Sequence, residues 1–447
     1  MPEDTICAPA TAPVNAPVAL IRISGPDSLT AACTFFSRQS IEPRKALYGS
    51  MGYGKRIDDV IFIFYPSPAS YTGEDMVEIF SHGNPLIVRK ILELLLSAGV
   101  RMAEPGEFSR RAFLNGKMDL TGAEAVNQLI MGKTEWEVSA ALEQMHGSLR
   151  ALIDGLREKI ILLKADIEAD IDFSDQNLDS IPSEALAEKA ASTRDDIADI
   201  LLRCRMGAKA SAGFNVTIAG KPNVGKSSMM NLMLNEERAI VSDIPGTTRD
   251  IIRERVTVEG MQLNIHDTAG IGESGDAIER MGIARSRKSI AESQAVLVVV
   301  DALRGIDAED RLVLDELKGK RYMVIINKTD AASEENISAI EKEIGRGIRF
   351  SAKTGAGLRE LEKFLADIVK NEFTLPLANS FIADIRIVQL LESALAGMES
   401  VIELSGEQPE IMAFELQEVL NKLGEITGEI SADDVLDSIF SRFCIGK

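Results

Sequence analysis

One short stretch limits what this chain can fold into: Gly220-Lys221-Pro222-Asn223-Val224-Gly225-Lys226-Ser227-Ser228. It follows an apolar run at 214–219 and precedes a helical pattern at 229–234, so a strand, a G-x-x-x-x-G-K-[ST] loop and a helix occur in order. The glycines let backbone N–H groups turn toward a phosphate, and the helix N-terminus adds positive partial charge. The stretch therefore predicts a nucleotide-binding P-loop, with Lys226 on the β- and γ-phosphates and Ser227 on Mg²⁺.

Composition narrows the class of protein further. The chain has 447 residues, more than one ordinary core holds, so several domains are expected. Its formal net charge of −20 argues against a protein that coats nucleic acid, because phosphate contacts need clustered Lys and Arg. The sequence has no long uncharged apolar run and no basic secretory start, which predicts no membrane association. Scattered cysteines and histidines without metal-ligand spacing predict a cytoplasmic protein with reduced thiols.

The first 119 residues are typical of a small α+β domain. Apolar runs predict strands at 18–23, 60–64 and 76–80, and a helix at 85–98 follows them. Arg22 and Glu78 lie inside two of these strands, where a charge is costly unless it is paired or faces a ligand. An edge strand with its charge facing water explains each of them equally well at this stage.

Apolar residues with helical spacing occupy both sides of the nucleotide-binding segment. The predicted helices cover 119–143, 151–172, 183–204 and two stretches after 376, with Thr121 as a candidate cap of the first. The Gly- and Ala-rich stretch 207–213 is typical of a linker.

Strand and helix patterns alternate within the nucleotide-binding segment, as in a parallel sheet covered by helices. A hairpin is predicted across 253–266, with Glu259-Gly260 at its turn. Short apolar runs at 296–300 and 323–326 predict buried parallel strands, and 357–370 predicts a closing helix.

Three further motifs follow the P-loop in order. Asp267-Thr268-Ala269-Gly270 ends an apolar strand, so Asp267 can reach Mg²⁺ through water and the Gly270 N–H can meet the γ-phosphate. In Asn327-Lys328-Thr329-Asp330, the carboxylate of Asp330 can accept from the ring N–H and the exocyclic amine of guanine, which selects GTP over ATP. Ser351-Ala352-Lys353 fits the remaining base-binding loop. The motifs together predict a Ras-like GTPase domain.

The stretch Ser242-Asp243-Ile244-Pro245-Gly246-Thr247-Thr248-Arg249-Asp250 lies between the P-loop and Asp267. A threonine at this place in the order supplies the second protein ligand to Mg²⁺. Thr248 is the first choice and Thr247 the second, while a turn rich in Gly and Thr without a ligand is the alternative.

Two usual catalytic groups are missing from the sequence. Ile271 stands where Ras-type GTPases place the glutamine that orients water, and Arg249 is as well explained by a salt bridge as by an arginine finger. Another group must then stabilise the transition-state charge. Asn223 and the carbonyl-rich loop 242–247 together predict a monovalent cation held against the phosphates, and Glu279 is a candidate for positioning water.

The segments predict a multidomain α/β protein. A Ras-like P-loop GTPase domain at 213–375 is inserted into an α-helical domain formed by 120–212 and 376–447, and a small α+β domain at 1–119 precedes both. Long apolar stripes on the helices also suit a dimer face.

Motifs outside the GTPase domain resemble the MnmE (TrmE) family of tRNA-modification GTPases. They are Ser70-Tyr71-Thr72-Gly73-Glu74-Asp75, Ser81-His82-Gly83, Glu104-Pro105-Gly106-Glu107-Phe108, Arg111-Ala112-Phe113-Leu114-Asn115-Gly116-Lys117 and the terminal Phe443-Cys444-Ile445-Gly446-Lys447. The resemblance runs end to end.

The resemblance implies a function. Family members form homodimers that pair with the FAD-dependent protein MnmG in a heterotetramer. They modify carbon 5 of the wobble uridine of tRNA, adding an aminomethyl or carboxymethylaminomethyl group. A tetrahydrofolate derivative, 5,10-methylene or 5-formyl, supplies the one-carbon unit, and K⁺ replaces the arginine finger in GTP hydrolysis.

The resemblance also implies roles for residues, carried over by matching motif. Folate contacts fall on Arg22, Glu78, Lys117 and Lys447, and Cys444 resembles a cysteine proposed to act in catalysis. Ligands to K⁺ fall on Asn223, Ser242, Ile244 and Thr247. Ligands to Mg²⁺ fall on Ser227 and Thr248, and Glu279 orients the water.

Two stretches depart from the family pattern. Ala12-Pro13-Val14-Asn15-Ala16-Pro17 replaces a glycine-rich stretch, a change that bears on the folate site or the dimer contact. Ile271-Gly272-Glu273 stands where the family often has Leu-Arg-Glu, and the lost arginine loosens the second switch.

Two other classes of function remain open from the sequence. A GTP-switched ribosome- or RNA-assembly factor with no chemistry of its own fits the GTPase motifs, although such a factor needs neither the terminal motif nor the folate-like domain. A dynamin-like membrane remodeller fits a dimerising GTPase with helices, but the chain has no basic amphipathic face for a membrane.

Overall fold

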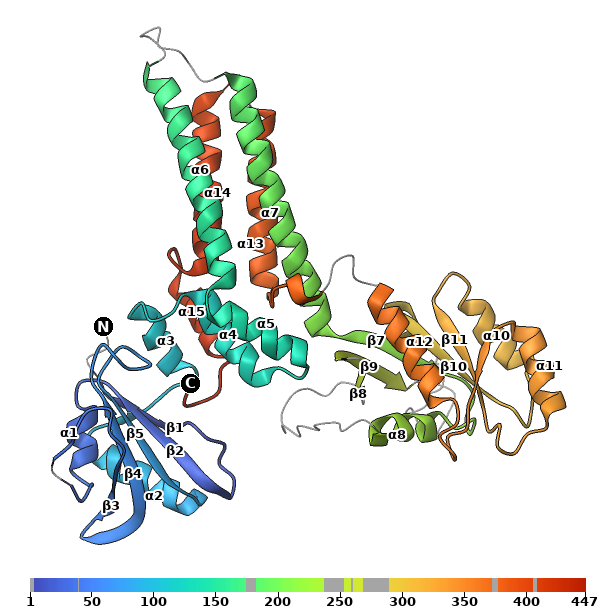
Figure 1. Ribbon diagram of the computed structural model, residues 1–447, viewed down its shortest axis with the longest axis horizontal. Coiled ribbons are helices and arrows are strands. Elements are labelled where there is room, and N and C mark those ends of the chain that lie inside the picture. Colours follow the sequence, from blue (N-terminus) through green and yellow to red (C-terminus); the bar gives the residue numbers. More distant parts are fainter. Residues whose placement is uncertain are drawn as a thin grey trace, which may run out of the picture. The chain divides into compact units, whose positions relative to one another are not determined.

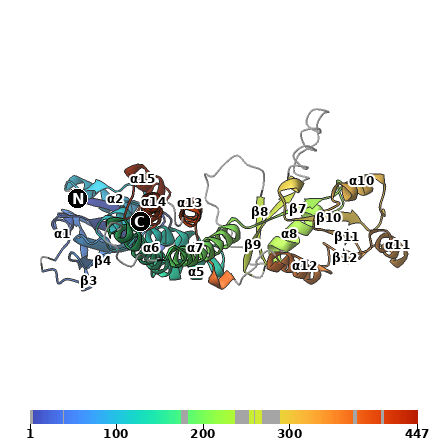
Figure 2. The same cartoon turned by 90° about the horizontal axis from the view of Figure 1, so that it is seen from above.

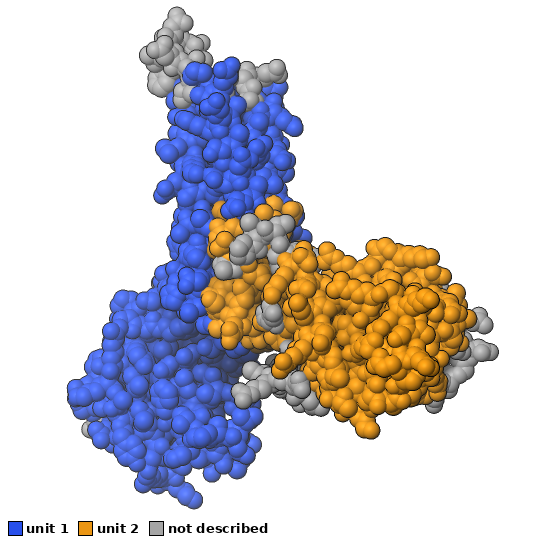
Figure 3. Space-filling view, turned by 45° about the vertical axis from the view of Figure 1, so that its right-hand side comes forward, with its two compact units in different colours: residues 1–130, 141–199, 386–447 blue, residues 131–140, 200–385 orange. Residues whose placement is uncertain are grey.

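The computed structural model describes residues 4–38, 40–173, 182–236, 253–258, 260–267, 289–371, 377–404 and 408–447. The chain divides into two units (Figure 3). Unit 1 comprises Met1–Ile130, Ala141–Asp199 and Arg386–Lys447, and unit 2 comprises Met131–Ala140 and Ile200–Ile385. None of the helices in these described ranges is long and apolar enough to cross a membrane.

Unit 1 begins with a mixed sheet in the strand order β3-β4-β5-β2-β1-β6 (Figure 1). The strands are β1 (Ile6–Pro9), β2 (Ala16–Ser24), β3 (Leu47–Tyr53), β4 (Lys55–Tyr65), β5 (Met76–Gly83) and β6 (Arg101–Met102). Neighbours are antiparallel except β1 and β6, which run parallel. Helices α1 (Ser28–Cys33) and α2 (Pro85–Ser97) share one buried apolar core with this sheet.

The sequence predicted β2, β4, β5 and α2, and the structure confirms them. It missed β1, β3 and β6. The strand β6 has only two residues, β1 contains Ala and Pro, and β3 contains two glycines, so none shows a clear apolar alternation. β3 forms a tight hairpin with the strongly apolar β4, β1 pairs with β2, and β6 pairs with β1 from far away in the sequence.

The helical part of unit 1 follows the sheet. The helices of the chain from α3 to α7 are α3 (Glu107–Leu114), α4 (Leu120–Met131), α5 (Glu135–Met145), α6 (Ser148–Phe173) and α7 (Ser183–Ala212). The later ones are α13 (Ile385–Glu403), α14 (Pro409–Thr427) and α15 (Asp433–Phe440). Helix α6 packs along α14 (Figure 1), and α15 shares a small apolar core with α3 and α4.

The prediction of one helix over 119–143 is wrong, because two helices occupy this stretch. Thr134 and Glu137 form a capping box that starts α5: the Thr134 Oγ1 accepts from the Glu137 N–H at 3.1 Å, and Glu137 Oε2 accepts from the Thr134 N–H at 3.0 Å. The cap of α4 is also corrected, since Asp119 Oδ1 accepts a backbone N–H at 2.7 Å where Thr121 was predicted to act.

The predicted linker at 207–213 is wrong as well. Helix α7 continues through this stretch to Ala212. Alanine and lysine are strong helix formers, and the buried Ala210 packs into the apolar core of unit 2. The helix therefore gains packing where composition suggested flexibility.

Unit 2 contains a sheet in the order β12-β11-β10-β7-β9-β8. The strands are β7 (Phe214–Ala219), β8 (Arg253–Val258), β9 (Met261–Asp267), β10 (Ala295–Asp301), β11 (Tyr322–Asn327) and β12 (Gly347–Arg349). All neighbours are parallel except the hairpin pair β8 and β9, which confirms the predicted hairpin.

Helices cover both faces of this sheet (Figure 2). Helices α8 (Lys226–Glu236) and α12 (Leu358–Asn371) contribute to the core on one face, and α10 (Ala308–Glu316) and α11 (Glu334–Ile344) line the core on the other. The predicted fold class, a P-loop α/β domain in a chain with helical and α+β parts, is confirmed.

The core of unit 2 includes side chains from outside its α/β segment. Trp136, near the start of α5, packs against the apolar cluster shared by β7, α8 and α12. Its Nε1–H donates to the backbone carbonyl of Leu377 at 2.8 Å. Residues that precede and follow the α/β segment thus meet at its surface.

Candidate functional site

The P-loop joins the carboxyl end of β7 to the N-terminus of α8, as predicted. Gly225 has φ +100°, and a Cβ at this position would lie 2.2 Å from the Asn327 side-chain nitrogen. Only glycine fits such a position, both for its backbone conformation and for its space. The loop is therefore packed directly against the strand end that carries the base-binding motif.

Lys226 is buried at the first turn of α8, with only 4% of its surface exposed. Its ammonium donates to the carbonyls of Gly220 at 2.6 Å and Lys221 at 2.7 Å. These contacts hold the charge inside the curve of the loop. Ser227 and Asn223 are exposed on the same loop, and Asn223 has φ +65°.

The base-binding motif is tied to the P-loop by two side chains. The Asn327 amide donates to the Val224 carbonyl at 2.8 Å and accepts from the Ala352 N–H at 3.1 Å. The Lys328 ammonium donates to the Asn223 carbonyl at 3.0 Å. The structure thus brings three of the predicted motifs together at the carboxyl ends of the parallel strands β7, β11 and β12, where α/β proteins bind their ligands.

Asp330 lies at the exposed edge of this arrangement. Its Oδ1 accepts from the Ser351 hydroxyl at 2.7 Å, and the buried Ser351 belongs to the third predicted motif. The preceding Thr329 donates its hydroxyl to the Phe350 carbonyl at 2.9 Å. Ser351 therefore orients the carboxylate, as the predicted guanine-selective role requires.

Sequence reasoning missed Asp301, the last residue of β10. Its side chain is 5% exposed, and Oδ2 lies 2.7 Å from the Lys328 ammonium. Its Oδ1 accepts from the Leu303 N–H at 2.9 Å. An acid that ends an otherwise apolar strand is the signal that marks it in the sequence.

Several predicted residues lie outside the described part of the chain. They include the whole stretch 242–250, the residues 268–270 and Glu279. The backbone of Asp267 is described: it ends β9 opposite Ile218, one residue before the end of β7.

A second group of predicted residues meets in unit 1. Arg22 on β2 lies directly opposite Glu78 on β5, and Nε lies 2.9 Å from Oε1. Both strands have neighbours on each side, so the edge-strand explanation is wrong and the two charges form a partly buried cross-strand pair. Tyr65 donates its hydroxyl to the other carboxylate oxygen of Glu78 at 3.4 Å.

Lys447 lies beside this pair. Burial lowers the pKa of its ammonium, the nearby Arg22 lowers it further, and Cys444 and Glu78 oppose the shift. Lys117 instead donates to the Pro68 carbonyl at 3.0 Å. The structure therefore gathers Arg22, Glu78 and Lys447, while Lys117 contacts the neighbouring loop 66–75. Cys444 is exposed close to Lys447, whose N–H donates to the Cys444 carbonyl at 3.3 Å.

A buried arginine, Arg111, links several segments of the same domain. The sequence motif at 111–117 contains it but predicted no role for it. Arg111 on α3 is 1% exposed, and its guanidinium lies 2.8 Å from Asp4, 3.0 Å from Glu107 and 3.2 Å from Glu74. It therefore joins the segment before β1, helix α3 and the loop 66–75.

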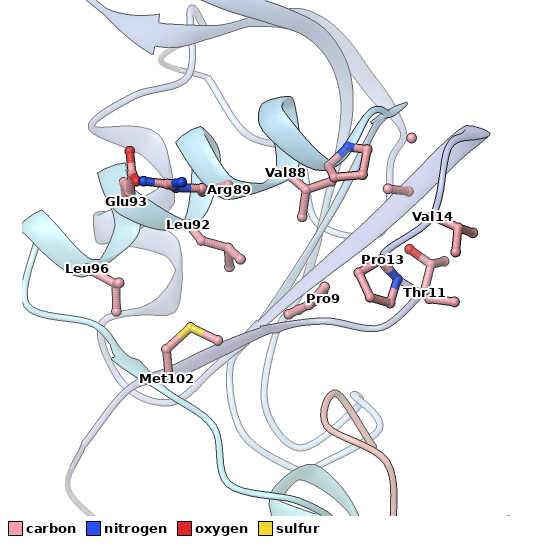
Figure 4. A pocket seen from close by; sticks show the side chains of 14 residues that line it. Pro9, Thr11, Pro13, Val14, Val88, Arg89, Leu92, Glu93, Leu96 and Met102 are labelled. Atoms are coloured by element: carbon pink, nitrogen blue, oxygen red, sulfur yellow. The ribbon is translucent and has the colours of Figure 1, made fainter. Parts of the chain in front are cut away.

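An apolar groove of about 330 Å³ lies between α2 and the segment before β2 (Figure 4). Val14, Leu96 and Met102 line it and are 60%, 41% and 37% exposed. The ion pair of Arg89 with Glu93 lies at its rim. Residues 12–14, from the stretch that departs from the family pattern, thus form one wall of an exposed apolar surface.

Known proteins match the chain along its whole length. Residues 5–117 match the family model of the GTP-binding protein TrmE N-terminus, and residues 120–444 match that of the MnmE helical domain. The tRNA modification GTPase MnmE of Thermotoga maritima is 42% identical over 99% of this chain and 100% of its own length. The protein of the same name from Aquifex aeolicus is 41% identical over 100% of both.

Among solved structures, Aquifex aeolicus Era bound to GDP and AlF4⁻ is 28% identical over 42% of this chain and 67% of its own, at a TM-score of 0.29. The full-length identity and the two family models, together with the P-loop and base-binding geometry, decide the family. The chain belongs to the MnmE family of tRNA modification GTPases.

Proposed function

We propose that this GTPase works with the FAD-dependent protein MnmG to modify carbon 5 of the tRNA wobble uridine, using a tetrahydrofolate one-carbon unit. The modification is the aminomethyl or carboxymethylaminomethyl group that the sequence resemblance implies. The observation that carries the proposal is the coexistence of two sites in one chain. A guanine nucleotide site stands in unit 2, and a charged cluster of Arg22, Glu78 and Lys447 stands in the domain that matches the TrmE N-terminus.

Mg²⁺ is assigned to Ser227 and Thr248. Ser227 fits, because its exposed hydroxyl lies at the first turn of α8 beside the buried ammonium of Lys226. Thr248 lies outside the described residues. Bound Mg²⁺ would neutralise charge on the phosphate oxygens, while Lys226 binds the phosphates and the loop N–H groups orient them.

K⁺ is assigned to Asn223, Ser242, Ile244 and Thr247. Asn223 fits a cation ligand: the residue is exposed at the tip of the P-loop, and its own carbonyl is held by Lys328 at 3.0 Å. Bound K⁺ would supply the positive charge that an arginine finger supplies elsewhere. The role of Asn223 is to orient its amide oxygen toward that charge, and Glu279 is assigned to position the water.

The folate site is assigned to Arg22, Glu78, Lys117 and Lys447. The fit rests on three charged side chains that are partly buried at one place, with two cations around one carboxylate. Such a net positive cluster suits a ligand with carboxylate groups. The bound folate would supply a one-carbon unit, and Cys444 is the candidate for acting on the uridine.

The proposed assembly is a homodimer that joins MnmG in a heterotetramer, binds tRNA and acts in the cytoplasm. The apolar groove beside Val14, Leu96 and Met102 supports the dimer, because exposed apolar surface of this kind commonly marks a contact between proteins. The free state of Cys7, Cys33, Cys204 and Cys444 suits a reducing compartment.

GTP hydrolysis is expected to be faster in KCl than in NaCl at equal ionic strength, by tenfold or more. A K⁺ ion placed against the phosphates is expected to contribute about 1.4 kcal/mol or more of transition-state stabilisation, which corresponds to a tenfold or greater increase in rate. Steady-state phosphate release measures it. Asn223→Ala should reduce the difference between the salts. Equal rates for the unchanged protein in the two salts would reject the cation assignment.

Mass spectrometry of tRNA nucleosides tests the function as a whole. A bacterial strain without this protein should contain tRNA that lacks the carbon-5 group on the wobble uridine, and a plasmid copy should restore it. A normal nucleoside profile in the deleted strain would instead favour a GTP-switched assembly factor without chemistry of its own.

A further inference from the structure

The last five residues of the chain fold back onto the N-terminal sheet of unit 1. Phe443 is buried against α15, and the Phe108 N–H of α3 donates to the Lys447 carbonyl at 3.2 Å. We propose that Gly446 and Tyr71 are positioning residues that set the Arg22 guanidinium and the Lys447 ammonium in the candidate folate site. The proposal rests on the folate assignment made above.

Gly446 is held where no other residue fits. It is buried and has φ +91°, and a Cβ added to it would lie 2.2 Å from the Pro9 carbonyl oxygen and 2.9 Å from the Ala10 Cα. Both neighbours are backbone at the end of β1, so neither can turn aside as a flexible side chain would. Any side chain at position 446 must therefore push the tail away from β1.

The position of the tail decides what surrounds Arg22. The Gly446 carbonyl accepts from Arg22 Nη1 in a long bond of 3.5 Å, while Glu78 binds Nε from the other strand at 2.9 Å. Lys447 is the next residue, and its ammonium interacts electrostatically with both Arg22 and Glu78. Displacing Gly446 thus removes one acceptor from Arg22 and moves the second cation of the cluster.

Tyr71 supports the guanidinium from another side. The Arg22 Cζ lies 5.4 Å from the centre of the Tyr71 ring, within the range of a cation–π contact. The Tyr71 hydroxyl shares a 2.8 Å hydrogen bond with Ser109, which is fully buried on α3. The ring is therefore fixed by the same helix whose N-terminus binds the tail.

Titration of (6S)-5-formyl-tetrahydrofolate into the full-length protein tests the proposal. Gly446→Ala should weaken binding at least tenfold. Gly99→Ala is the matched control, because Gly99 has φ +88° with open space around its Cβ position, and it should bind as the unchanged protein does. Tyr71→Leu should weaken binding about tenfold, whereas Tyr71→Phe, which keeps the ring, should recover most of it. Thermal unfolding checks that all variants fold.

A second measurement does not depend on folate binding. Reductive methylation with ¹³C-formaldehyde followed by NMR titration reports the pKa of each lysine, and Lys447→Arg identifies the signal of Lys447. That signal should titrate below ordinary lysines in the unchanged protein and return toward them in Gly446→Ala, because the tail leaves its buried place beside Arg22. If the unchanged protein binds no folate but this shift occurs, the folate assignment fails and the positioning role stands. An unchanged Lys447 titration in Gly446→Ala overturns the positioning role. If the unchanged protein binds folate, equal folate binding by the two alanine variants overturns it as well.

Discussion

Replacing Asp330 by asparagine is expected to weaken GTP binding roughly a hundredfold or more and to make xanthosine triphosphate the better substrate. We expect the carboxylate to accept from two guanine donors, and hydrogen bonds to a charged group contribute about 1.5–3 kcal/mol each. An asparagine amide instead offers a donor to the oxygen that xanthine carries in place of the amine. Ser351 already holds the carboxylate at 2.7 Å, so the side chain is preset for this exchange.

Competition binding with fluorescent GDP, followed by turnover of GTP and xanthosine triphosphate, measures the effect of Asp330→Asn. Asp315→Asn serves as the control, since Asp315 is an exposed acid of α10 paired with Lys318 at 2.9 Å on the surface. The control should keep the preference for GTP. Retention of that preference by Asp330→Asn would remove Asp330 from base recognition.

Replacing Arg111 by leucine is expected to destabilise the N-terminal sheet domain by about 3–5 kcal/mol, the usual cost of breaking a buried ion pair from one side. Burial alone would lower the pKa of Arg111, but its bonds with Glu107 and Glu74 raise it on balance. The side chain of Glu74 is only 15% exposed to solvent, and without the guanidinium its carboxylate loses this cationic partner. The segment before β1 also loses an anchor at Asp4.

Hydrogen exchange of β1 and β2 in the full-length chain localises this loss. The matched control is Arg110→Leu, because the adjacent Arg110 is 32% exposed and pairs only across the surface with Asp437 among its described contacts. Exchange should accelerate strongly in Arg111→Leu and little in Arg110→Leu. Equal exchange in the two variants would show that the buried ion pairs of Arg111 stabilise the domain no more than the surface pair of Arg110 does.

The same network predicts how stability depends on pH. Burial alone would raise the pKa of Glu107, but hydrogen bonds from Arg101 and the Glu104 N–H lower it on balance below its ordinary value of 4.5. A carboxyl whose pKa is lowered by folding stabilises the folded state above its unfolded pKa. That contribution is lost as the pH falls through the folded pKa. The hydrogen bond and the charge of Arg111 also lower the pKa of Glu107, so Arg111→Leu should show a smaller loss of stability on acidification.

The sequence was sufficient where function depends on local spacing. The P-loop and the stretches 327–330 and 351–353 each carry their geometry within a few residues, so strand–loop–helix order alone predicts that they converge at one edge of the sheet. The hairpin of β8 and β9 was predictable for the same reason. Short-range patterns determine such elements because their hydrogen bonds close within the pattern.

Long-range partners were not predictable in this way. The edge-strand alternative for Arg22 could be rejected only once β2 was known to lie between β5 and β1. The role of Asp301 depends on Lys328, which lies 27 positions away, and that of Arg111 depends on Asp4, which lies 107 positions away. Helix α7 ran through a supposed linker because tertiary packing of Ala210 outweighed a composition suggestive of a loop.

Trp136 has a practical consequence for anyone who cuts this chain into pieces. A fragment of residues 213–375 would omit both Trp136 and Leu377, which pack against its apolar cluster from either side of that range. The excised domain would expose apolar surface that the whole chain covers. Its solubility and its rate of nucleotide turnover would therefore differ from those of the domain in the intact protein. Trp136 is also the sole tryptophan of the chain. Its fluorescence emission in the intact, unlabelled protein therefore reports whether its ring is packed against this apolar cluster.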